Sequence, residues 1–293
     1  MGDSAWAVRV PASSANIGAG FDVLGVALTL YAEVGPGAPP VDARATDEHH
    51  PADIAFRALG GIGPLWVRSS IPIARGLGFS GSVRVGGAAA AVVQRDGLDS
   101  LADEAARRDV LAITAGLERH ADNVAASIYG GVVVAADDTV TRVPLAFDPA
   151  VVVWVPDATT TSTDHSRSRL PDTVERASAV FNLGRVATFV AACAAGDRAA
   201  LRLATEDRLH QPTRLAQVPG SAAALDAALD AGAWAAWLSG SGPTIAAWCE
   251  PARADEIAAS LPAGGHVKLL RIDHEGVVVS GVAAADRPVS RGN

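Results

Sequence analysis

Apolar residues in the first half of the chain fall into short runs that glycine-rich or polar stretches separate. Runs of strand-like length predict strands at residues 7–10, 23–31, 65–69 and 131–135. The alanine-rich residues 86–94 predict a helix. Residues 101–119 predict another, because apolar side chains recur there at helical spacing and Ser100 can cap the first turn.

The pattern restarts beyond residues 145–149, where a domain boundary is expected. Asp172 can cap a long helix that Gly196 ends. Further helices are expected at 198–209, at 222–231 and from Pro251 onward, and strands at 151–155, 234–238, 245–249, 266–272 and 276–282. Strands interleaved with helices in both halves predict two α+β lobes, residues 1–147 and 148–293.

Composition and charge narrow the classes of function. The net charge is -8 and no block of basic residues occurs, which argues against a nucleic acid or an anionic membrane as the main partner. The N-terminus lacks a signal-peptide pattern and no apolar run is expected to span a membrane, so a cytoplasmic protein is expected. Lys268 is the single lysine in the sequence, so a mechanism that needs a lysine has one candidate.

The segment Gly76–Ser82 (GLGFSGS) precedes the alanine-rich helix. Small residues let a backbone approach a ligand closely, and a helix start offers unpaired N–H groups that suit a triphosphate. A serine hydroxyl in this segment could also ligate Mg²⁺. The segment is not a Walker A loop, because no Gly-Lys-Ser follows. A glycine-rich turn that only packs the helix on a sheet is an equal alternative at this point.

Two further segments hold polar side chains among small residues. Asn16 and Asp22 follow the first strand, and an aspartate there could pair with an ammonium group, although a turn in which both bond their own backbone is the simpler interpretation. Glu118 precedes the stretch HADNV at 120–124, where a carboxylate could complete a Mg²⁺ site with a serine. Capping of a helix end is the alternative for this cluster.

Two arginines are candidates for binding a carboxylate, because a guanidinium can bind one through two parallel hydrogen bonds. Arg167 follows Thr163 closely, whereas Arg214 lies far along the chain. Each alone would be an ordinary surface charge, so the pair matters only if the fold brings them together. Residues 238–244 (LSGSGPT) lie between two expected strands and form either another loop whose backbone can approach a ligand or a hairpin connection.

Taken in order, these segments resemble the motifs of the GHMP kinases, and in detail those of the homoserine kinase family. Three motifs of the superfamily are matched by residues 8–22, 72–82 and 239–244. Three stretches narrower to homoserine kinases are matched by residues 120–124, 162–171 and 207–214. The last is the most specific, and the matches span residues 8–244 in the expected order.

The resemblance implies a fold and an activity. The fold would be α+β, the two-lobed GHMP kinase fold, with an N-terminal lobe like ribosomal S5 domain 2 and a ferredoxin-like C-terminal lobe, often as a homodimer. The activity would be the phosphorylation of the hydroxyl of L-homoserine to O-phospho-L-homoserine, a step of threonine biosynthesis. ATP and Mg²⁺ would be required, and the partners would be these small molecules.

The resemblance also implies roles, residue by residue. Asn16, Asp22 and Asn123 would hold the amino and hydroxyl ends of homoserine, with His120 nearby as a weak candidate base. The carboxylate would be bound by Thr163, Arg167 and Arg214. The Mg²⁺ ligands would be Ser80 and Glu118. The nucleotide phosphates would lie against Pro72, Arg75, Gly76, Leu77, Gly78, Phe79, Ser80, Gly81 and Ser82.

Two residues depart from the family pattern or fit it loosely. Phe79 stands where the loop usually has a serine, which bears on ATP affinity, and Glu118 lies unusually near residues 120–124. Two alternatives therefore stay open. One is a GHMP kinase for another small hydroxy acid or alcohol, such as mevalonate or a sugar. The other is a ligand sensor with the same fold that lacks catalysis.

Overall fold

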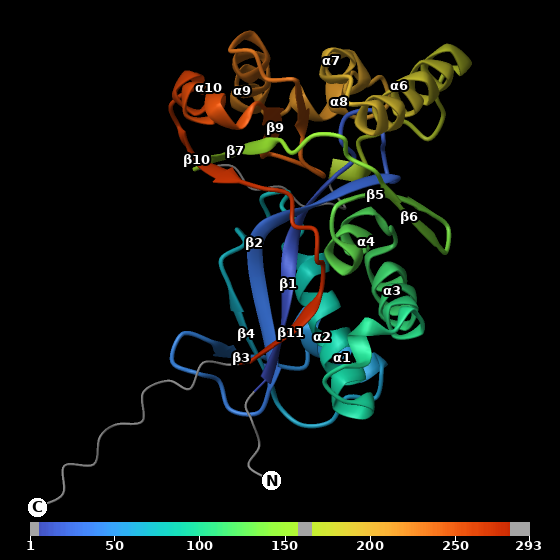
Figure 1. The fold of residues 1–293 in the computed structure, drawn as a ribbon, viewed down its shortest axis with the longest axis vertical. Helices are drawn as coiled ribbons and strands as arrows, with labels where there is room; N and C mark the ends of the chain where they lie inside the picture. Colours follow the sequence, from blue (N-terminus) through green and yellow to red (C-terminus); the bar gives the residue numbers. More distant parts are fainter. Residues whose placement is uncertain (1–5, 158–165, 282–293) are drawn as a thin grey trace, which may run out of the picture.

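The computed structural model describes residues 6–157 and 166–281, which build two antiparallel sheets (Figure 1). In this part of the chain the first sheet has seven strands. They are β1 (Trp6–Ala15), β2 (Leu24–Pro36), β3 (Arg44–Ala45), β4 (Leu65–Ser69), β5 (Val132–Ala136), β6 (Thr139–Val143) and β11 (Val278–Gly281). Their order is β11-β1-β2-β4-β3, while β5 pairs with β2 and with β6. The last described strand thus pairs with the first, Trp6 opposite Gly281.

Helices cover one face of this sheet (Figure 1). They are α1 (Pro51–Ala58), α2 (Phe79–Asp96), α3 (Glu104–Glu118) and α4 (Asp122–Tyr129). Helix α2 packs against β1, β2 and the other three helices, and its small side chains are buried along most of its length. A methyl group at Gly87 would lie 1.9 Å from the carbonyl oxygen of Ala52, so α1 and α2 can approach this closely only through a glycine.

The second sheet has the order β10-β7-β9-β8 within the described residues. Its strands are β7 (Ala150–Pro156), β8 (Ala235–Leu238), β9 (Ile245–Cys249) and β10 (Gly265–Leu270). Over it lie α6 (Arg176–Ala195), α7 (Leu201–Ala204), α8 (Gln211–Leu215), α9 (Pro219–Asp230) and α10 (Ala254–Ser260) (Figure 1). Trp248 lies at the centre of an aromatic cluster, with ring centroids 5.5 Å from those of both Phe189 and Trp237.

Helix α6 corrects the expectation that no segment could cross a membrane. It is 20 residues long with a mean hydropathy of 1.4, so length and composition alone would allow it to span one. The protein packs one face of it: Phe189 is fully buried, whereas Val180 and Leu183 are exposed. The Asn182 amide on the packed face donates to the carboxylate of Asp207. These contacts make α6 part of the layer over the second sheet.

The predicted strands are confirmed, and the predicted helices, apart from the one at residues 198–209, differ mainly at their starts. Residues 100–102 form a 3₁₀ turn, and α3 begins at Glu104, because Asp103 rather than Ser100 accepts the first free N–H, that of Ala105.

In the second half, α6 begins at Arg176 rather than just after Asp172. Residues 198–209 are not one helix, since after α7 the chain turns around the Asp207 carboxylate. The pattern did not predict α1, α4, α8, β3 or β6.

Candidate active site

A cavity of ≈ 280 Å³ opens where loops of the two halves meet, close to the size of small-molecule sites, roughly 300–1,000 Å³. Segments far apart in the sequence supply its wall. The lining residues are Asn16, Asp22, Ile73, Ala74, Arg75, Gly76, Gly78, Phe79, Ser80, Gly81, Glu118, His120, Asp122, Asn123, Arg167, Arg214, Gly240 and Ser241. The structure therefore brings together the four catalytic candidates, both arginines and both metal-ligand candidates that the sequence indicated.

The loop before α2 approaches its neighbours too closely for side chains. Gly76 (φ 75°) and Gly78 (φ 69°) both have left-handed backbones. An added Cβ would lie 2.3 Å from the carbonyl oxygen of Ser239 at Gly76, and 2.2 Å from Ser13 Oγ at Gly78. Gly78 is also the N-cap of α2 and makes no side-chain cap hydrogen bond, which leaves the first N–H groups of a long helix facing the cavity. Such a helix start binds anions, phosphates in particular.

Ser80 and Glu118 meet beside this loop, from the first turn of α2 and the last residue of α3. The Ser80 hydroxyl donates to Glu118 Oε1 over 2.6 Å. Arg84, one turn further along α2, places Nε 2.6 Å from the same carboxylate oxygen and 3.3 Å from Ser80 Oγ. Hard cations such as Mg²⁺ prefer oxygen ligands of this kind. Sequence reasoning missed Arg84, because its spacing to Glu118 carries no signal.

The turn between β1 and β2 holds Asn16 and Asp22 under backbone strain. Both residues have positive φ, 71° and 58°, which is uncommon for residues other than glycine and frequent at functional sites. The side-chain oxygen of Asn16 accepts a hydrogen bond from the backbone N–H of Asp22 at 3.0 Å, and its side-chain nitrogen donates one to the carbonyl oxygen of Gly240 at 2.9 Å. One side chain thus fixes the Asp22 backbone and ties this turn to the 238–244 loop.

The two arginines come together as the carboxylate hypothesis requires. Arg167 binds both carboxylate oxygens of Asp22, at 2.7 and 2.8 Å. The guanidinium carbons of Arg167 and Arg214 each lie 5.3 Å from the centroid of the Phe21 ring. Burial and the neighbouring charge of Arg167 lower the pKa of Arg214 to about 10, so Arg214 stays charged at neutral pH.

His120 and Asn123 complete the wall at the start of α4. Nδ1 of His120 lies 2.9 Å from Asp122 Oδ1. Burial disfavours the charged imidazole, but the hydrogen bond and charge of Asp122, with Glu118 and Asp22 near, raise the pKa of His120 above its ordinary value. The shift favours the protonated imidazole over the neutral ring that a general base requires. The side-chain oxygen Oδ1 of Asn123 accepts a hydrogen bond from Ser13 Oγ at 2.9 Å, which orients the side-chain amide of Asn123.

Some residues that the sequence analysis proposed do not line the cavity. Leu77 is fully buried in the core, and Ser82 directs its hydroxyl to a carbonyl oxygen of β1, so neither lines the cavity. Pro72 is also outside the lining, as is Lys268 on β10. Thr163 lies outside the described residues. Gly78 to Gly81 all line the cavity, whereas Leu77 and Ser82 on either side of them do not, and the motif alone does not reveal this.

Known proteins resemble this chain in sequence and in fold. Residues 189–267 match the family model for the C-terminal part of GHMP kinases. The chain is 42% identical over 254 residues to a homoserine kinase of Thermus thermophilus, which covers 81% of this chain and 85% of the relative. It is 37% identical over 300 residues to a homoserine kinase of Desulfitobacterium hafniense, which covers 93% and 99%.

Solved structures of related kinases have the same fold as this chain. The crystal structure of a homoserine kinase from Cytophaga hutchinsonii superposes with a TM-score of 0.81 at 26% identity, covering 96% of this chain and 98% of that one. A mevalonate kinase of Methanococcus jannaschii shares the fold alone, with a TM-score of 0.66 at 12% identity over 93% and 99% of the chains. The expected two-lobed α+β fold is thereby confirmed. With such relatives matching over most of their length, the chain belongs to the homoserine kinase family of the GHMP kinases.

Proposed function

We propose that this protein transfers the γ-phosphoryl group of ATP to the hydroxyl of L-homoserine and so forms O-phospho-L-homoserine for threonine biosynthesis. The observation that carries the proposal is a cavity whose wall places the Asp22 carboxylate beside the guanidinium groups of Arg167 and Arg214, next to a glycine-rich helix start. The relatives named homoserine kinase support the same substrate.

Homoserine is a zwitterion, and Asp22 and Arg167 form a matching pair of opposite charges. In the structure the two side chains neutralise each other. A bound amino acid would place its ammonium group at Asp22 and its carboxylate at Arg167 and Arg214, which exchanges one ion pair for two. Asn16 and Asn123 add amide groups that can bond the amino and hydroxyl ends. Mevalonate has a carboxylate but no ammonium group, so it would leave Asp22 unpaired.

The nucleotide would lie with its phosphates at the start of α2, on Gly76, Gly78, Ser80 and Gly81. A Mg²⁺ ion fits the Ser80 hydroxyl and the Glu118 carboxylate, both hard oxygen donors. In residues 6–157 and 166–281, no three His, Cys, Asp or Glu side chains cluster as a metal site. The ion would therefore take its other ligands from phosphates and water, and would neutralise phosphate charge in the reaction.

Positioning and charge neutralisation account for the chemistry. The homoserine hydroxyl oxygen forms the new bond to the γ-phosphorus as the bond to the ADP oxygen breaks, and the hydroxyl proton is released to water. The side chains around the cavity hold the two substrates in line and supply positive charge. We assign no general base.

The same proposal includes a division of the chain into two lobes, a cellular compartment and an oligomeric state. We divide the chain near residue 148 into a nucleotide-binding lobe and a lobe that supplies Arg167 and Arg214, with β11 returning to the first sheet. The protein would work in the cytoplasm, as a homodimer, without a nucleic-acid or membrane partner.

Steady-state ADP release tests the proposed function. The assay contains Mg·ATP with homoserine, mevalonate, threonine or galactose, and a control without any alcohol. Turnover that depends on homoserine supports the proposal. Turnover with another alcohol alone would keep the phosphate loop and remove the roles of Asp22 and the two arginines. No turnover with any alcohol, alongside measurable ATP binding, would favour the sensor alternative.

A further inference from the structure

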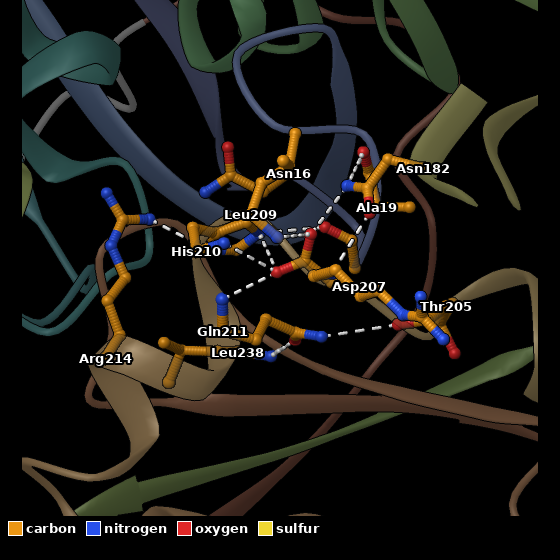
Figure 2. A network of polar contacts seen from close by, with 12 residues as sticks. Asn16, Ala19, Asn182, Thr205, Asp207, Leu209, His210, Gln211, Arg214 and Leu238 are labelled. Carbon is orange, nitrogen blue, oxygen red and sulfur yellow. Dashed lines mark hydrogen bonds and ion pairs between the residues drawn. The ribbon is translucent and has the colours of Figure 1, made fainter. Parts of the chain in front are cut away.

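A buried polar network lies directly behind Arg214 (Figure 2). The Asp207 carboxylate accepts the backbone N–H groups of Leu209, His210 and Gln211, at 2.9, 2.8 and 2.6 Å. It also accepts from the Asn182 amide on α6 at 2.6 Å. Four donors fix this carboxylate, which therefore sets the path of the chain into α8.

The network places the ring of His210 between two groups with fixed hydrogen-bonding roles. Nε2 lies 2.8 Å from the carbonyl oxygen of Gly18, which can only accept. Nδ1 lies 3.1 Å from Nη1 of Arg214, which can only donate. Only the neutral ring with its proton on Nε2 satisfies both neighbours.

The surroundings of the ring favour this neutral form. His210 has no exposed surface and stacks on Phe21 with the ring centroids 5.1 Å apart. Burial lowers the pKa of His210, and the charge of Arg214 lowers it further, against the opposing pull of Asp207, whose Oδ2 lies 3.6 Å from Nε2. Asp22 also favours the charged ring, but more weakly.

Arg214 depends on neutral acceptors for its position. In the described part of the chain no carboxylate lies within 4.0 Å of its guanidinium, and its Nε has no hydrogen-bond partner. Nη1 is held by His210 Nδ1 and by the carbonyl oxygen of Gly240 at 3.2 Å. An acidic partner would neutralise the guanidinium, whereas two neutral acceptors hold it while its charge stays available for a ligand.

We propose that His210 is a positioning residue: as the Nε2–H tautomer, locked between Gly18 and the Asp207 turn, it aims Arg214 at the carboxylate of the substrate. The inference rests on the proposed function, in which Arg214 binds that carboxylate. It assigns part of the specificity of the site to a histidine that does not line the cavity.

Two substitutions separate positioning from packing. His210→Phe keeps a ring on Phe21 but removes the acceptor for Arg214, whereas His210→Asn loses the ring and keeps an acceptor oxygen near the place of Nδ1. We expect H210F to raise the KM for homoserine by about tenfold or more, the size of a lost hydrogen bond to a charged group, and H210N to stay within about threefold of the wild type. The KM for ATP should not change in either variant.

The opposite order of the two variants, with H210N the more damaged, would overturn the inference and leave His210 a packing residue. Equal changes in the KM for homoserine and for ATP would do the same. The ¹⁵N chemical shifts of the histidine rings give a test that needs no turnover. At pH 7 they should show a protonated Nε2 and an unprotonated Nδ1 for His210, and an imidazolium pattern would refute the inference. Absence of homoserine turnover in the wild type, with the expected tautomer, would count against the proposed function alone.

Discussion

Replacement of Arg167 by alanine isolates the substrate carboxylate from the rest of the site. In the structure this guanidinium makes two charge-assisted hydrogen bonds to Asp22, so its geometry already suits a carboxylate. A hydrogen bond to a charged group contributes about 1.5–3 kcal/mol. Arg167 is 42% exposed and must release Asp22 before it binds a ligand, so the net loss should correspond to one such bond rather than two.

The expected effect is a fall in kcat/KM for homoserine of about 10- to 100-fold, since each 1.4 kcal/mol is a factor of ten. Coupled ADP release at varied homoserine and at varied ATP measures it, and the KM for ATP should stay within about twofold if Arg167 makes no contact with the nucleotide. Arg167→Lys keeps the positive charge but not the two parallel N–H donors of a guanidinium, so it should recover only part of the lost kcat/KM.

Arg185→Ala is the matched control. Arg185 also pairs with a carboxylate, that of Glu206, but lies outside the cavity lining. It should leave kcat/KM for homoserine unchanged. If Arg167→Ala behaved as this control does, the carboxylate would bind elsewhere and the exchange of ion pairs would be refuted.

Three further predictions test the metal, the phosphate loop and the buried network. Glu118→Gln removes a charged ligand, so it should lower kcat and should raise the Mg²⁺ concentration needed for half-maximal rate by about tenfold or more. An unchanged Mg²⁺ dependence would argue against Glu118 as a ligand. Gly78→Ala should raise the KM for ATP, because the new Cβ would clash with Ser13 Oγ at 2.2 Å, whereas Gly37→Ala, also at positive φ but in open space, should not. Asp207→Asn should destabilise the fold by about 1–3 kcal/mol at neutral pH through the loss of charge-assisted bonds, measured by urea unfolding.

The pH dependence of the Asp207→Asn comparison has a fixed sign. Burial raises the pKa of Asp207, but the hydrogen bonds that it accepts from the Asn182 amide and from backbone N–H groups favour the carboxylate, and its pKa lies below the ordinary 3.8. The carboxylate therefore stabilises the wild type above pH 3.8, and this contribution is lost as pH falls through the lowered pKa. The stability difference between the two proteins should shrink over that acidic window. A difference that is constant with pH would mean that the charge of Asp207 is not involved.

Local patterns predicted the strands well, because short apolar runs bounded by glycine or polar residues have few other structures open to them. They failed where a nearby side chain takes backbone N–H groups and so changes where a helix begins or ends. Residues 198–209 look helical, yet Asp207 draws three backbone N–H groups to itself and ends the helix early. Helix α3 starts at Glu104 because Asp103 was a better cap than Ser100.

In the site, residues that belong to a motif could be predicted, whereas contacts between distant segments could not. The glycine loop and the Asn16–Asp22 turn carry motifs, so the resemblance located them. The pairing of Asp22 with Arg167, across 145 positions, and the contact of Arg84 with Glu118 depend on the packing of the two halves. The role that we infer for His210 depends on which neighbours meet its two ring nitrogens, and spacing along the chain does not encode that.

Direct identification of the product tests the central claim. The protein is incubated with Mg·ATP and L-homoserine, and ³¹P NMR follows the phosphate signals over time. The account predicts that a phosphomonoester signal matching authentic O-phospho-L-homoserine grows as ADP appears, in equal amounts. ADP with inorganic phosphate in place of that ester, or no loss of ATP, would contradict it.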